Sequence, residues 1–174
     1  AIVEKRAGRG SKSGRGSQGQ KGPPRRLRPV HRLDRETSGL MVFARTIQAE
    51  SALGKQFRAH ALQRHYIAVC LGKAPATTYD TRLVEDRGDG RRGGTKFPNQ
   101  GKRAVTHVKP LERLVAYTVI QCRLETGRTH QIRIHLAEAS HPICGDKVYR
   151  GPFPGAPLPD DSGAARVALH AADL

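Results

Sequence analysis

Apolar and polar residues alternate most clearly over residues 64–71, RHYIAVCL. One side of this run carries Ile67, Val69 and Leu71, and the other side carries Tyr66, Ala68 and Cys70. Successive side chains of an extended chain point to opposite faces of a sheet. The alternation therefore predicts a β-strand with two different faces.

Further strands are predicted on both sides of this one. Residues 40–45 (LMVFAR) form an apolar run, and residues 105–114 and 115–124 have the pattern of a strand pair. Residues 86–101 are rich in glycine and basic side chains, which predicts a loop between the arms of a hairpin. A last strand is expected within residues 167–174.

Helical spacing occurs in two places. Thr46 is a suitable N-cap for a helix that runs to about His60. The apolar side chains at inward positions of this helix are Ile47, Leu53 and Phe57. Residues 128–139 predict a second helix, whose apolar stripe is formed by Ile132, Leu136 and Ala139. Because strands outnumber helices and follow one another along the chain, we expect an α+β fold with a mixed, largely antiparallel central sheet flanked by helices.

Residues 1–28 differ from the rest of the chain. They are rich in Gly, Ser and basic residues, so we expect a flexible segment, followed by a folded domain at residues 29–174. The segment is either an arm that contacts RNA or a plain linker. Residues 14–19 match G-x-G-x-x-G, but no strand precedes them and no helix follows, so no nucleotide cofactor is predicted.

The charge of the chain indicates a polyanionic partner. There are 31 Lys and Arg residues against 15 Asp and Glu, a formal net charge of +16. The stretch from Lys5 to Leu33 contains no acidic residue. Phosphate backbones are the commonest partners of such basic proteins, so we expect a nucleic acid.

The cysteines and the apolar runs bear on the compartment. Cys70, Cys122 and Cys144 are widely spaced and include no C-x-x-C pair, which indicates core thiols in a reducing compartment. No apolar stretch has the length of a membrane span, and no signal peptide is visible. We expect a cytoplasmic protein with no membrane partner; because the sequence starts at Ala1, an organelle is the alternative.

The segment HRLDRETSGL, residues 31–40, places Asp34 between Arg32 and Arg35. Nearby opposite charge favours the charged form of a carboxylate, so Asp34 is expected to be ionised at neutral pH. An ionised carboxylate on a turn is suited to nucleophilic or electrostatic work on a bound substrate. The alternative from these residues alone is a surface loop with ion pairs.

A second informative segment is ETGRTHQIRIHLAEASHPICGDKVY, residues 125–149. Arg128 and His130 fall at the start of the predicted helix, where free N–H groups favour anions. Arg133 projects away from the apolar stripe, so it either faces a cleft or lies over the surface of the core. The histidines of this segment lack the spacing of metal ligands, so no metal site is predicted.

Four blocks together resemble the RluA-type RNA pseudouridine synthases. The first is HRLDRETSGL, the second is RHYIAVCLG, and the third combines GRTHQIRIHLA with HPICGDKVY. The closing block is LHAADL, residues 169–174. GKRAVTHVKPL, residues 101–111, resembles the strand between the second and third blocks. The resemblance implies a pseudouridine synthase fold with an RNA-binding cleft.

The resemblance also implies roles for individual residues. Asp34 would be the catalytic aspartate, Tyr66 would stack under the uracil, and Arg133 would form an ion pair with Asp34. Arg32 would occupy the space left by the extruded base or bind its phosphate. The substrate-binding residues implied are Arg32, Arg35, Thr37, Arg128, His130, Gln131 and Leu169, with Lys147 as a further contact to the RNA backbone.

The implied reaction is the isomerisation of uridine in rRNA or tRNA to its C-glycoside, without metal or cofactor. Asp34 would either attack C1′ of a flipped-out nucleotide or remove a ribose proton to give a glycal. We expect a monomer whose catalytic domain is incomplete at both ends, since the usual turn before the first block is only loosely matched and the chain stops at Leu174. The alternative is a non-catalytic, basic RNA-binding or ribosome-associated protein.

Overall fold

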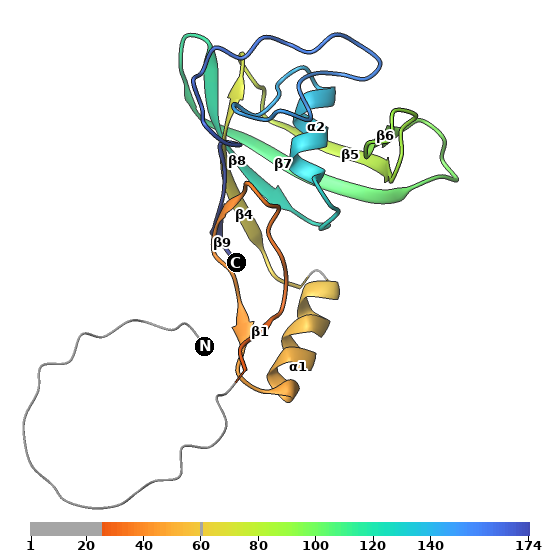
Figure 1. The fold of residues 1–174 in the computed structure, drawn as a ribbon, viewed down its shortest axis with the longest axis vertical. Coiled ribbons are helices and arrows are strands. Elements are labelled where there is room, and N and C mark those ends of the chain that lie inside the picture. Colours follow the sequence, from red (N-terminus) through yellow and green to blue (C-terminus); the bar gives the residue numbers. More distant parts are fainter. Residues whose placement is uncertain (1–25, 60) are drawn as a thin grey trace, which may run out of the picture.

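The predicted strands form the centre of the molecule. The computed structural model describes residues 26–59 and 61–174, and within them seven strands form one sheet in the order β2-β9-β4-β8-β7-β5-β6 (Figure 1). These strands are β2 (Ser38–Gly39), β4 (Arg64–Leu71), β5 (Thr77–Val84), β6 (Gly93–Thr95), β7 (Lys102–Arg113), β8 (Tyr117–Leu124) and β9 (Leu169–Asp173). In the same part of the chain, only β2 and β9 pair in parallel. The α+β prediction is confirmed.

The strand predicted at residues 64–71 is confirmed as β4. It pairs with β8 from Arg64 opposite Leu124 to Leu71 opposite Tyr117. β8 begins two residues later than predicted, because residues 114–116 turn the chain between β7 and β8, where the N–H of Leu114 bonds to the carbonyl of Tyr117 at 2.9 Å. β7 contains a proline, Pro110, which the sheet accommodates through a register shift beside it.

Two of the predicted connections differ from the structure. The loop expected over residues 86–101 contains β6, a three-residue strand that pairs with the end of β5. The strand expected over residues 40–45 is reduced to β3 (Phe43–Ala44), which pairs with β1 (Arg28–Pro29) apart from the large sheet. Short strands without their own alternation depend on partners far along the chain, which a local pattern does not reveal.

Helix α1 (Ile47–Arg58) is capped as predicted. The Thr46 hydroxyl accepts a hydrogen bond from the Ala49 N–H at 3.0 Å. Leu53 and Phe57 are half-buried, but Ile47 is 64% exposed, so its predicted inward position is wrong. The buried residue of α1 is Gly54, and the helix lies beside β1 and β3 (Figure 1).

Helix α2 (Gln131–Glu138) starts three residues later than predicted. His130, just before it, has a left-handed backbone (φ 59°), which does not continue a right-handed helix. The helix packs against β6 and β7, and every residue from Gln131 to Ala137 is buried. The predicted apolar stripe is therefore only one part of a helix that is enclosed on most sides.

The main core lies between the large sheet and α2. Ile132 and Leu136 of α2 belong to the same buried cluster as Ala68 of β4 and Ile120 of β8. The three cysteines are buried and free, as predicted. Burial, with the nearby Cys144, raises the pKa of the Cys70 thiol to about 12, which makes it unreactive at neutral pH.

No helix in the described ranges is both long enough and apolar enough to cross a membrane. The basic segment predicted at residues 1–28 and the glycine pattern at residues 14–19 lie largely outside the described residues. Arg28, at the end of that segment, is already part of β1.

Candidate active site

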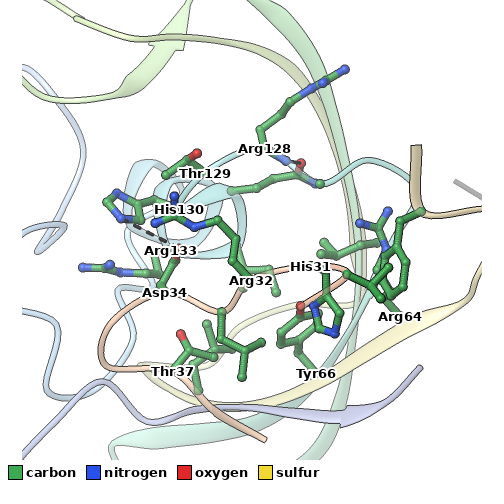
Figure 2. Close-up of a pocket in the computed structure, with 18 of the residues that line it drawn as sticks. His31, Arg32, Asp34, Thr37, Arg64, Tyr66, Arg128, Thr129, His130 and Arg133 are labelled. Atoms are coloured by element: carbon green, nitrogen blue, oxygen red, sulfur yellow. Dashed lines mark hydrogen bonds and ion pairs between the residues drawn. The ribbon is translucent and has the colours of Figure 1, made fainter. Parts of the chain in front are cut away.

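The first and third sequence blocks meet at one pocket. Its volume is about 410 Å³, and side chains enter it from the loop before β2, from β4 and from the segment that leads into α2 (Figure 2). α1 and the first residue of β9 complete the wall. Lining residues include Arg32, Asp34, Thr37, Phe57, Arg64, Tyr66, Arg128, Thr129, His130, Gln131, Arg133 and Leu169.

Asp34 lies on a tight turn at this pocket. The N–H of Thr37 donates to the Asp34 carbonyl at 3.0 Å, and the Asp34 side chain is 19% exposed. Arg166 fixes the far side of the turn, since it donates to the carbonyl of Glu36 at 3.2 Å and to the hydroxyl of Ser38 at 3.1 Å. The carboxylate is therefore held at the pocket wall by a segment near the end of the chain.

Arg133 also lines the pocket, but its ion pair is not the predicted one. Its Nε and Nη2 donate to Asp146 at 2.6 and 2.9 Å, and the Asp146 side chain is fully buried. Burial works to lower the pKa of Arg133, yet the hydrogen bonds to Asp146, with the nearby charge of Asp34, raise it above its ordinary value. Arg133 is a permanent cation that is fixed by Asp146 and acts on Asp34 through space.

Among the described residues, the basic side chain within ion-pair distance of the Asp34 carboxylate is His130, whose imidazole is charged only when it is protonated. Nε2 of His130 lies 4.0 Å from Oδ1 of Asp34, as the dashed line in Figure 2 marks. Nδ1 of the same ring lies 2.9 Å from the hydroxyl of Tyr149. Burial lowers the pKa of His130, while the Asp34 charge works in the opposite direction.

Tyr66 and Leu169 come together from neighbouring strands. The register between β4 and β9 shifts between His65 and Tyr66, an irregularity that often re-aims a side chain next to a functional site. Tyr66 is half-buried, and burial raises its pKa despite the nearby Arg64. Leu169 is only 4% exposed and gives the pocket an apolar wall.

The other predicted substrate-binding residues differ in their position. Arg32, Thr37, Arg128, His130 and Gln131 line the pocket, whereas Arg35 is exposed outside its lining. The side-chain amide of Gln131 hydrogen-bonds to other protein groups. Its oxygen accepts from the Thr126 hydroxyl and the Arg128 N–H, and its nitrogen donates to the Val105 carbonyl and the Thr106 hydroxyl of β7. Gln131 therefore links β7 of the sheet to the loop that contains Arg128.

Asp146 and Arg64 were not among the site residues predicted from the sequence. Asp146 was visible as the one acidic residue of HPICGDKVY, but nothing in its spacing from Arg133 indicates a contact. Arg64, at the start of β4, donates to the carbonyl of Glu125 at 3.3 Å and lines the pocket beside Tyr66. Nothing in the block RHYIAVCLG distinguishes Arg64 as a site residue.

A second pocket adjoins the first. Both are lined by Gly127, Arg128 and Thr129, and the second continues past them to Arg92 and Lys102 over a volume of about 650 Å³. Within the described ranges, no three His, Cys, Asp or Glu side chains gather as metal ligands would. The charged side chains that line the second pocket are Arg92, Lys102, Arg128 and Glu85, which pairs with Arg92 at 3.2 Å, so cations outnumber acids and suit a phosphate-bearing ligand.

Comparison with known proteins identifies the family. The family described as RNA pseudouridylate synthase matches residues 5–138. The chain belongs to this family. The match includes the segments that carry Asp34, Tyr66 and Arg133, the residues that the resemblance of the sequence blocks had singled out.

Members of the family with curated names are similar to much of the chain. A "Ribosomal large subunit pseudouridine synthase D" of Neisseria meningitidis serogroup A is 48% identical over 126 residues, covering 71% of this chain and 33% of the relative. The protein of the same name from Xanthomonas campestris pv. campestris is 43% identical over 152 residues, covering 83% of this chain and 45% of the relative. The chain thus spans less than half the length of these relatives.

Solved structures of the family agree with the fold. "Human RNA Pseudouridylate Synthase Domain Containing 4" superposes with a TM-score of 0.68 at 25% identity, over 83% of this chain and 65% of that one. "Human RNA Pseudouridylate Synthase Domain Containing 1" superposes with a TM-score of 0.71 at 24% identity, over 83% and 62%. The pseudouridine synthase fold predicted from the sequence blocks is confirmed.

Proposed function

We propose that this chain carries the catalytic domain of an RNA pseudouridine synthase, an isomerase that converts uridine in RNA to pseudouridine. The observation that supports this most is the position of Asp34, a carboxylate 19% exposed at the wall of a pocket of about 410 Å³. This volume lies in the range of roughly 300–1,000 Å³ that small-molecule sites occupy, so a single extruded nucleoside fits. We assign the domain to residues 29–174, with residues 1–28 as a separate basic segment.

The reaction is an isomerisation. The bond between N1 of the uracil and C1′ of the ribose breaks, the base turns over, and C5 forms a new bond to C1′. The proton on C5 is then lost, N1 gains a proton, and no electron or group enters or leaves. Asp34 acts first, either by attack on C1′ or by removal of a ribose proton, and both routes require its ionised form.

The other residues of the pocket divide the remaining tasks. Arg133, 7% exposed and fixed by Asp146, supplies a fixed positive charge close to Asp34. The ring of Tyr66 stacks under the uracil, and we assign to the same residue the assistance to loss of the C5 proton. Arg32, at the exposed edge of the pocket, occupies the space left by the extruded base or binds its phosphate.

The proposed substrate is ribosomal RNA of the large subunit, with tRNA as the alternative. The relatives named for the large ribosomal subunit support the first choice. The formal charge of +16 and the cations of the second pocket, Arg92, Lys102 and Arg128, suit an RNA backbone. We further propose that the protein acts in the cytoplasm as a monomer and needs no nucleotide or metal cofactor.

The experiment is release of tritium from RNA that carries [5-³H]uridine, with no added metal or nucleotide. The proposal predicts tritium release together with pseudouridine in the recovered RNA. The protein could instead bind RNA and release no tritium, both from total cellular RNA and from large-subunit rRNA transcribed without modification. That result would indicate a non-catalytic RNA-binding protein. Comparing rRNA with tRNA as substrate distinguishes the two substrate classes.

A further inference from the structure

A histidine and a buried tyrosine form a pair beside Asp34. Nδ1 of His130 lies 2.9 Å from the Tyr149 hydroxyl, and Nε2 of the same ring lies 4.0 Å from Oδ1 of Asp34. Tyr149 is only 2% exposed, whereas the His130 side chain is 30% exposed toward the pocket. The imidazole therefore links a buried hydroxyl to the carboxylate.

The hydroxyl of Tyr149 determines which nitrogen of His130 carries the proton. A buried O–H that lacks an acceptor is costly, and among the described residues the hydrogen-bond partner of this hydroxyl is Nδ1 of His130. When Tyr149 donates, Nδ1 is the acceptor and holds no proton. A neutral imidazole then carries its hydrogen on Nε2, the nitrogen that faces Asp34.

The surroundings favour this neutral form. Burial lowers the pKa of His130, and the cations Arg133 and Arg92 act in the same direction. The acids Asp34 and Asp146 act in the opposite direction, and the net shift is downward. At neutral pH, with Tyr149 as the donor, the ring is thus an acceptor at Nδ1 and a donor at Nε2.

The pair is held in place by the segment that also holds Arg133. The N–H of Tyr149 donates to Oδ1 of Asp146 at 3.0 Å, and the Arg133 guanidinium lies over the Tyr149 ring at 5.1 Å. The rings of His130 and Tyr149 meet edge to face, with centroids 5.4 Å apart. His130 itself adopts a left-handed backbone (φ 59°), and its side chain lines the pocket.

We propose that His130 is a positioning residue for Asp34, with Tyr149 setting the tautomer that this requires. The Nε2–H hydrogen bonds to one carboxylate oxygen when substrate fills the pocket, and the other oxygen is left directed at the nucleotide. The kinetic effect of His130 rests on the proposed function. The tautomer of the His130 ring does not depend on catalysis. Neither residue needs to touch the reacting atoms.

The tautomer is measured directly by ¹⁵N–¹H correlation NMR of the histidine rings at neutral pH, with His130→Gln to assign the signal. The proposal predicts protonated Nε2 in the wild-type chain and a mixture of tautomers in Tyr149→Phe. A wild-type ring protonated at Nδ1 would overturn the proposal whether or not the protein isomerises uridine. A wild-type chain that shows the Nε2–H tautomer but releases no tritium would contradict the proposed function instead.

The kinetic effect is measured with Tyr149→Phe in single-turnover and steady-state tritium release. We expect kcat to fall about fivefold, the value of one ordinary hydrogen bond, with KM unchanged. Loss of the donor to Nδ1 removes a stabilisation of the neutral ring, so the pKa of His130, followed by the same ring signals in NMR, should rise. Tyr117→Phe, a half-buried tyrosine on β8 outside the pocket, is the matched control and keeps the wild-type kcat and the wild-type His130 titration.

His130→Ala and His130→Gln repeat the test at a partly exposed position, in case Tyr149→Phe does not fold. The alanine variant loses the donor and should lose kcat about fivefold. The glutamine variant keeps an N–H donor, so kcat is partly restored. Wild-type kcat in the alanine variant would overturn the positioning role.

Discussion

Arg133 is fixed by two hydrogen bonds to a carboxylate that is fully buried. Asp146 also accepts the N–H groups of Val148 and Tyr149 at 2.9 and 3.0 Å, so one side chain organises both the arginine and the loop after α2. A buried charge that loses its counter-ion is strongly destabilising. Asp146 is therefore as important to the geometry around Asp34 as the residues that line the pocket.

Asp146→Asn tests this at the level of stability. The amide is nearly isosteric but leaves the buried Arg133 guanidinium without its hydrogen-bonded carboxylate, so we expect the free energy of unfolding to fall by about 3 kcal/mol. Urea denaturation followed by circular dichroism measures the change. Asp161→Asn, at an exposed position of the loop before β9, is the control and should have little effect. Equal stability of the two variants would contradict the role assigned to the ion pair.

The residues that the sequence blocks singled out do meet, but their contacts could not be predicted. Asp34, Tyr66 and Arg133 could be named because each belongs to a block with a recognisable pattern, and all three line one pocket. The predicted pairing of Arg133 with Asp34 was wrong. The carboxylate that accepts the hydrogen bonds of Arg133 is that of Asp146, 13 residues further along the chain. Partner choice depends on distances that exist only after folding.

For helices and strands, the local residue pattern predicted the middle of an element better than the residues at which it begins and ends. The alternation of β4 and the Thr46 cap of α1 are properties of adjacent residues, and both predictions were confirmed. The start of α2 was wrong because His130 takes a left-handed conformation that its residue type does not require. The parallel pairing of β2 with β9 joins Ser38 to His170, and no local pattern signals such a distant partner.

Helix α2 also contains a titratable group that links stability to pH. His135 is 2% exposed and shares hydrogen bonds of 2.9 Å with the hydroxyls of Thr81 and Thr106. Burial lowers its pKa to about 4, whereas the unfolded chain titrates near 6.5. Between these values the unfolded chain binds a proton that the folded chain does not, so stability is lost as the pH falls through this window.

The expected loss from His135 between pH 6.5 and pH 4 is about 3 kcal/mol. Urea denaturation at a series of pH values measures it, and the quantity to compare is the slope of stability against pH. His135→Gln, which does not titrate, should flatten that slope, while His170→Gln at an exposed position of β9 should not. A wild-type slope in His135→Gln would show that the buried ring is not the group responsible.

At the scale of the whole molecule, positive charge extends beyond the catalytic pocket. The second pocket continues from Arg128 to Arg92 and Lys102, where β5 ends and β6 and β7 begin. Under the proposed function, an RNA that places one nucleotide in the first pocket would bring its flanking phosphates toward these cations. Composition predicted a polyanionic partner, but not which part of the surface would bind it, because that depends on how the fold brings these cations together.

Lys102→Ala tests this path for the RNA backbone. Loss of one phosphate contact should weaken binding for all RNA sequences and lower the slope of log Kd against log salt by about 1. Lys109→Ala is a matched control on the same strand, seven residues or about 24 Å away. Fluorescence anisotropy with labelled RNA at several salt concentrations measures both. Equal slopes for the two variants would place the RNA elsewhere on the surface.

The catalytic carboxylate that we propose is that of Asp34. Asp34→Asn keeps the shape of the side chain and removes its charge, so tritium release from RNA carrying [5-³H]uridine should be abolished. RNA affinity, measured on the same preparation, should stay close to that of the wild-type chain because the surrounding cations are unchanged. Tritium release by Asp34→Asn at the wild-type rate would contradict the account.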